Sequence, residues 1–153
     1  MKYLIIITLL VSPFVNANKN NDFDMFIKNF YDDFSQRKLK KISEEVFHQD
    51  AQFIFGEHIM VPGSAIELEA VFISIIASLE KDGYKKSVVR HINTNYTGDN
   101  YVVSTIFFDR YKNNNEKLDS MCSTYSAVKL AGGWKILTWL PTKPQESDSC
   151  FKQ

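Results

Sequence analysis

The sequence predicts an α+β fold in which a cone-shaped, curved antiparallel sheet packs against about three N-terminal helices. Three observations predict this fold. Apolar residues recur at helical spacing in the first half of the chain, they alternate with polar residues from Lys85 onward, and short turns separate the alternating runs. Because the helices precede a meander of strands, we expect them to cover one face of the sheet.

Three segments have helical patterns. Apolar residues between Phe23 and Phe34 recur at intervals of three and four and predict one helix with a single apolar stripe. A second, shorter helix follows with Leu39 and Val46 on its buried side. The third begins at a Ser64–Glu67 capping box. It is apolar over most of its circumference, so we expect it to be largely buried.

Strand patterns occupy the rest of the chain. Two short strands, Ala51–Phe55 and His58–Val61, flank a Gly-containing turn. Four longer runs then alternate with period two, and the short connections between them predict antiparallel neighbours. These runs are Val88–Tyr96, Tyr101–Lys112, Glu116–Leu130 and Trp134–Leu140.

Residues 1–17 are typical of a cleavable signal peptide. Lys2 precedes an apolar run, and residues 15–17 have the small side chains usual before a cleavage site. The run is shorter than the roughly 20 residues that span a bilayer. We therefore expect cleavage after Ala17, a periplasmic or secreted product, and no membrane contact after cleavage. The remaining chain divides into a linker (18–21), one domain (22–142) and a C-terminal tail (143–153).

Composition and motifs narrow the range of partners. The chain has 18 basic and 18 acidic residues, without the basic excess of a nucleic-acid-binding protein. It has no glycine-rich phosphate loop and no metal-ligand spacing, so we expect no cofactor and no metal. Cys122 and Cys150 can pair in an oxidising compartment. The alternative is two separate thiols, because the distance between their Cα atoms cannot be read from the sequence.

Five short segments in this order resemble a known superfamily. They are residues 23–34, 47–51, 62–66, 90–93 and 132–136. Together they resemble the nuclear transport factor 2-like superfamily, in its SnoaL-like and ketosteroid isomerase-like branch, over about residues 22–142. The resemblance implies a helix-covered cone that is either filled or kept as a pocket. That superfamily includes enzymes, ligand carriers and interaction domains, so the fold does not choose an activity.

The resemblance implies a role for His91. In SnoaL-like proteins a histidine at a similar place often faces the cavity, where it can act as a general base. Strand alternation places His91 and Asn93 on one face, and Arg90 and Ile92 on the other. The alternative is a structural histidine that is hydrogen-bonded within the sheet.

Asp109 is the second catalytic candidate. It shares a strand face with apolar residues, and a carboxylate in such surroundings has a raised pKa and can serve as a base. The alternative is a salt bridge or solvent exposure near the strand end, where Arg110 follows.

Two functions follow from these residues. An aromatic content of 14% suits a cone that binds a small apolar molecule, with these ligand-binding candidates: His91, Asn93, Phe53, Phe55 and Tyr31. The alternative is a lyase, isomerase or hydrolase of acid–base type that uses His91 with a carboxylate. The residues leave open whether the protein is an enzyme.

Alternation along the last strand suggests a partner surface. It places Trp134 and Ile136 on one face, and Leu137 and Trp139 on the other. An exposed Leu137/Trp139 patch on the outer sheet face predicts a homodimer. The alternative is that the tail, held by Cys150, covers Trp139.

Overall fold

The structure is a computed structural model that describes residues 22–145 and 149–151. The predicted signal peptide, the linker and part of the tail lie outside the described residues. Within the described ranges, no helix is both long enough and apolar enough to cross a membrane.

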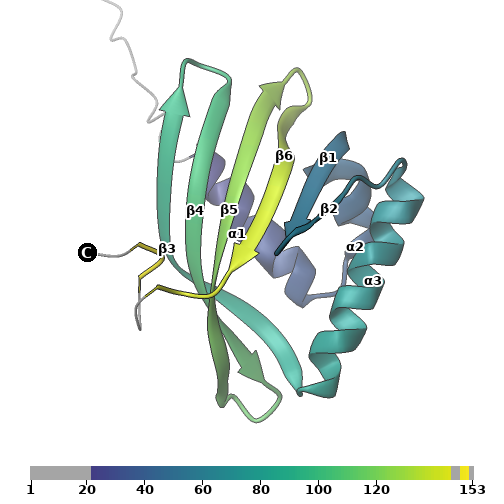
Figure 1. Ribbon diagram of the computed structural model, residues 1–153, viewed down its shortest axis with the longest axis vertical. Coiled ribbons are helices and arrows are strands. Elements are labelled where there is room, and N and C mark those ends of the chain that lie inside the picture. The colour runs from purple at the N-terminus through teal and green to yellow at the C-terminus, as the bar shows by residue number, and fades with distance from the viewer. Residues whose placement is uncertain (1–21, 146–148, 152–153) are drawn as a thin grey trace, which may run out of the picture.

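Six strands form one open, curved sheet in the order β2-β1-β6-β5-β4-β3 (Figure 1). The last four form the predicted antiparallel meander. The strands are β1 (Phe47–Phe55), β2 (His58–Met60), β3 (Tyr84–Thr97), β4 (Tyr101–Lys112), β5 (Lys117–Leu130) and β6 (Gly133–Thr142).

Strand β1 joins the meander by a parallel pairing with β6, in which Phe47 lies opposite Ile136. The sheet is therefore mixed. No short turn connects these two strands, so the connection lengths did not reveal the pairing. The pairing also draws the start of β1 back to Phe47, before the predicted start at Ala51. The predicted α+β architecture is confirmed.

The helices cover the concave face and one side of this sheet, as Figure 1 shows. Helix α1 (Asp22–Ser35) lies behind the long strands in that view and buries the predicted stripe, including Phe23, Ile27 and Phe30. Helix α2 (Leu39–Lys41) continues into a π-helical turn, η2 (Ile42–Val46). Helix α3 (Ala65–Lys81) lies beside β1 and β2.

Helix α3 begins at the predicted capping box but is less buried than expected. The Ser64 hydroxyl accepts a hydrogen bond from the Glu67 amide. The Glu67 carboxylate accepts one from the Gly63 amide. Only Leu68, Phe72 and Ile76 are buried along the helix. Because α3 lies at the side of the sheet, its opposite face is open to solvent and exposes apolar residues there.

A β-bulge in β6 reverses the expected orientation of Trp139. Ser126 pairs with Thr138 and Ala127 pairs with Ile136, so Leu137 is an extra residue without a partner opposite. The bulge returns Trp139 to the face that Ile136 occupies. Trp139 is 8% exposed and packs among the aromatic rings of the core. The expected Leu137/Trp139 surface patch is not formed, because core residues, rather than the described residues of the tail, cover Trp139.

Candidate functional site

The concave face of the sheet and helices α1 and α3 border a cavity of about 190 Å³. Its wall is largely apolar and rich in aromatic rings. Three polar side chains, Tyr31, Ser87 and Arg110, interrupt this wall. The apolar lining residues are Phe30, Phe34, Phe55, Ile75, Leu79, Phe108, Met121, Trp139 and Pro141.

The cavity opens toward solvent between α3 and the strands β4 to β6. The lining residues on this side are half-buried, in contrast to the buried aromatic residues of α1. They include Leu79 on α3, Arg110 on β4, Met121 on β5 and Pro141 on β6. These half-buried residues form the open side of the cavity, and the rings of α1 form its inner wall.

A buried pair of hydroxyl groups lies beside the inner wall of the cavity. The hydroxyl oxygens of Tyr31 and Tyr125 are 2.9 Å apart. Close to them, Trp139 Nε1 donates to Ser123 Oγ at 3.0 Å. Burial raises the pKa of Tyr31 and of Tyr125 well above their usual range. Both hydroxyls are therefore protonated at neutral pH and act as neutral hydrogen-bonding groups.

An ion pair lies at the open side of the cavity. Arg110 on β4 stands directly opposite Asp119 on β5. Arg110 Nε donates to Asp119 Oδ1 at 2.6 Å, and Arg110 Nη2 donates to Asp119 Oδ2. The Arg110 side chain is 17% exposed. The paired carboxylate holds the guanidinium group in place at the cavity wall.

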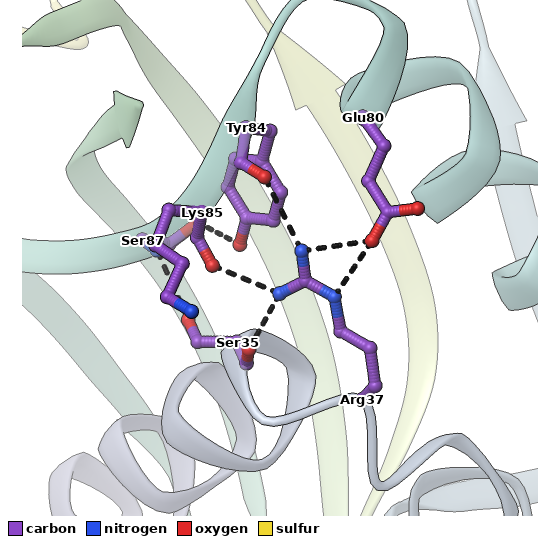
Figure 2. A network of polar contacts seen from close by, with 6 residues as sticks. All are labelled: Ser35, Arg37, Glu80, Tyr84, Lys85 and Ser87. Carbon is purple, nitrogen blue, oxygen red and sulfur yellow. Dashed lines mark hydrogen bonds and ion pairs between the residues drawn. The ribbon is translucent and has the colours of Figure 1, made fainter. Parts of the chain in front are cut away.

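Arg37 makes polar contacts with residues of α1, α3 and β3, as Figure 2 shows. Its guanidinium group donates to the Glu80 carboxylate of α3. It also donates to the backbone carbonyl oxygens of Ser35, Tyr84 and Lys85. Arg37 thus ties the end of α1 to α3 and to the start of β3. This contact is structural and fixes the distance between the two helices that border the cavity.

Two of the predicted ligand-binding residues, Tyr31 and Phe55, line the cavity. Phe53 is fully buried in the core behind it. Asn93 is exposed on β3 and does not line the cavity. The sequence pattern missed Arg110, because an arginine beside a strand end is typical of a solvent-exposed residue.

His91 lies on the outer face of the sheet, away from the cavity. Val89 pairs with Phe108 and His91 pairs with Phe107, so Arg90 is the extra residue of a β-bulge. The His91 side chain is exposed, and its ring stacks on Phe107 at 6.1 Å between centroids. The expected cavity-facing general base is therefore not found at this position.

Asp109 also lies on the outer face, where it is held by several donors. Arg90 Nε and Lys117 Nζ each lie 2.7 Å from its carboxylate. Ser120 Oγ donates to it at 2.8 Å. The β-bulge at Arg90 explains the contact between Arg90 and Asp109, because it turns Arg90 to the outer face rather than to the face of Ile92.

The electrostatics of Asp109 differ from those of a general base. Burial raises its pKa, but the hydrogen bonds from Lys117, Arg90 and Ser120 lower it more, to about 2. The raised pKa that a catalytic role requires is therefore not found, and the alternative prediction, a salt bridge, is confirmed. Within the described residues, Asp109 and His91 share no hydrogen bond. The structure therefore does not assemble these two residues into an acid–base pair.

The tail is attached to the outer face by a disulfide bond between Cys122 on β5 and Cys150. Their Cα atoms are 5.7 Å apart. Cys122 lies opposite Phe107 in the sheet. The disulfide therefore holds residues 149–151 beside β4 and β5, on the side of the sheet that the helices do not cover.

Comparisons with known proteins agree with this architecture. A structure from Novosphingobium aromaticivorans, described as an NTF2-like protein with a cystatin-like fold, superposes with a TM-score of 0.67 at 10% identity, over 84% of each chain. Aln2 from Streptomyces gives a TM-score of 0.64 at 11% identity, over 81% of this chain and 89% of that one. These similarities show the fold.

A candidate ketosteroid isomerase from Shewanella frigidimarina is also similar. Its TM-score is 0.63 at 16% identity, over 82% of this chain and 98% of that one. No curated protein sequence matches the chain. The family model described as "NTF2-like protein (DUF6841)" matches residues 20–144, which is most of the chain. The chain therefore belongs to this NTF2-like family.

Proposed function

We propose that this protein is exported and binds a small, largely apolar molecule in the cavity between the sheet and helices α1 and α3. The observation that carries the proposal is the cavity itself, with its wall of aromatic and aliphatic side chains and three polar groups. Binding sites for small molecules have this composition, because apolar walls supply affinity and a few polar groups fix orientation.

The size of the cavity limits the ligand. A volume of about 190 Å³ is small for a ligand site. An apolar cavity of about 150 Å³ holds one benzene molecule. We therefore infer a ligand with a single ring, or an aliphatic chain of similar volume, rather than a steroid-sized molecule.

The chemistry of the wall favours binding over acid–base catalysis. Among the described residues that line the cavity, the ionisable side chains are Tyr31 and Arg110. Burial raises the pKa of Tyr31, and an arginine stays protonated, so neither acts as a base near neutral pH. His91 and Asp109, on which the enzymatic alternative depended, lie on the outer face.

The disulfide supports the export part of the proposal. Stable disulfides form in oxidising compartments and are rare in the cytosol. Residues 1–17 have the pattern of a cleavable signal peptide. Mass spectrometry of the protein recovered outside the cytosol should give an N-terminus at Asn18. An intact Met1 in that fraction would contradict cleavage.

Thermal unfolding with one-ring probes tests the binding part. We expect benzene, toluene and indole to raise the melting temperature of the wild-type protein, because a ligand that binds only the folded state stabilises it. Ile75→Trp should fill the cavity and remove the shift. Ile73→Trp is the matched control, because Ile73 is on the same helix but is 54% exposed and does not line the cavity. If no probe shifts the wild-type melting temperature, the proposal is wrong.

A further inference from the structure

The three polar side chains of the cavity wall differ in how many hydrogen-bonding groups remain without a partner within the protein. The Tyr31 hydroxyl is bound to the Tyr125 hydroxyl. The Ser87 hydroxyl is bound to the Tyr84 hydroxyl at 2.9 Å. Each of these two hydroxyls therefore already has a partner within the protein. Arg110 is the third polar lining residue, and it has more hydrogen-bond donors than either hydroxyl group.

A guanidinium group carries five N–H donors on three nitrogens. Arg110 uses Nε and Nη2 for the two oxygens of Asp119. Its remaining nitrogen, Nη1, makes no hydrogen bond to any residue in the described part of the chain. Arg110 therefore keeps donors for a ligand, and the two-point contact with Asp119 fixes their direction.

The charge of the pair decides which acceptor suits these donors. Asp119 already compensates the positive charge of Arg110 at hydrogen-bond distance. A ligand carboxylate would bring a second negative charge close to Asp119, in a cavity whose remaining described lining is largely apolar and carries no second positive charge. A neutral oxygen acceptor meets the same donors without this repulsion.

We infer that the ligand carries a neutral hydrogen-bond acceptor of the carbonyl type, that Arg110 binds this acceptor at the open side of the cavity, and that Asp119 sets the preference against anions. The inference rests on the proposed function, since it assigns the polar end of the same cavity. It makes Arg110 a binding residue and Asp119 a positioning residue.

Three probes of nearly equal size test the inference: ethylbenzene, acetophenone and benzoate. They differ at one substituent, which is apolar, a neutral acceptor or an anion. We expect wild-type protein to bind acetophenone about tenfold more tightly than ethylbenzene, as one hydrogen bond to a charged donor allows. Benzoate should bind more weakly than acetophenone. Calorimetric titration measures all three affinities.

Two variants separate the roles of the ion pair. Arg110→Met removes the donors and keeps an apolar side chain of similar length. The variant should therefore bind acetophenone no more tightly than ethylbenzene. Asp119→Asn leaves the charge of Arg110 uncompensated. The affinity for benzoate should therefore rise about tenfold relative to the affinity for acetophenone. Arg90→Met is the matched control, because Arg90 is also paired with an aspartate but lies on the outer face. It should change none of the three affinities.

The outcomes distinguish this inference from the proposed function. If ethylbenzene binds but acetophenone binds no better, Arg110 does not select an acceptor and the inference falls, while the cavity remains a binding site. If Asp119→Asn leaves the order of the three probes unchanged, the role of Asp119 is wrong. If none of the probes binds, both proposals fail. The wild-type and Asp119→Asn results hold even if Arg110→Met does not fold.

Discussion

The hydroxyl oxygens of Tyr31 on α1 and Tyr125 on β5 lie 2.9 Å apart and connect the first helix to the centre of the sheet. Both side chains are buried. A buried hydroxyl that loses its partner retains the cost of its desolvation, so the two residues are energetically coupled. This coupling can be measured directly.

We expect Tyr31→Phe and Tyr125→Phe each to lower the free energy of unfolding by about 1–3 kcal/mol, because each leaves the other hydroxyl without this partner. The double variant should lose less than the sum of the two single losses. Urea denaturation of the wild type, both single variants and the double variant provides the full cycle. Additive losses would show that the hydroxyls do not interact.

Asp109 should make stability depend on pH in the acid range. Its pKa in the folded state is lowered to about 2 from an ordinary value of 3.8. The ionised Asp109 carboxylate therefore stabilises the folded state above about pH 4, and this stabilisation is lost as the pH falls toward 2. Its size is about 2 kcal/mol, since each pKa unit corresponds to about 1.4 kcal/mol.

The variant Asp109→Asn should lack this part of the acid dependence and should be less stable than the wild type at neutral pH. Glu57→Gln, in the exposed turn between β1 and β2, is the matched control and should retain the wild-type profile. Denaturant unfolding from pH 2 to pH 7 measures both profiles. Parallel curves for Asp109→Asn and the wild type would rule out the assigned role.

Arg37 adopts a left-handed backbone conformation, with φ of 60°. A residue with a Cβ atom is strained there by about 1–2 kcal/mol, and glycine is not. Arg37→Ala should lose the contacts to Glu80 and β3 and keep the strain. Arg37→Gly should lose the same contacts and relieve the strain. We therefore expect the glycine variant to be about 1 kcal/mol more stable than the alanine variant, as measured by urea denaturation; the reverse order would contradict the assignment.

The Cys122–Cys150 disulfide should stabilise the fold. It closes a loop with a sequence separation of 28 residues, and loops of this size correspond to about 2–4 kcal/mol. Reductant should lower the urea midpoint of the wild type. The double variant Cys122→Ala/Cys150→Ala should already have the lower midpoint and should not respond to reductant. Equal midpoints for oxidised and reduced wild type would show that the disulfide contributes nothing.

Much of the fold follows from local sequence patterns. The stripe on α1, the capping box at Ser64 and the turns of the meander are each encoded within a few residues, and the structure confirms them. The pairing of β1 with β6 is not encoded in this way, because it depends on segments that are distant in the sequence.

The candidate site was less predictable because two bulges alter strand alternation. Period-two reasoning assumes an uninterrupted strand, and one extra residue reverses every later orientation. The extra residue Leu137 turns Trp139 into the core. The extra residue Arg90 joins His91 on the outer face and reaches Asp109. Whether a strand bulges depends on its neighbours in the sheet, which periodicity does not describe.

The parallel pairing of β1 with β6 has a consequence for synthesis. During translation the β1–β2 hairpin is made early, and β6 is completed near the end of the described chain. One edge of β1 therefore stays unpaired until β6 has been synthesised. Unpaired edges invite association between chains, and contacts between such distant segments form slowly. A product that terminates before Gly133 would leave the facing edges of β1 and β5 permanently open. Premature termination in this region should therefore yield aggregates instead of a smaller folded protein.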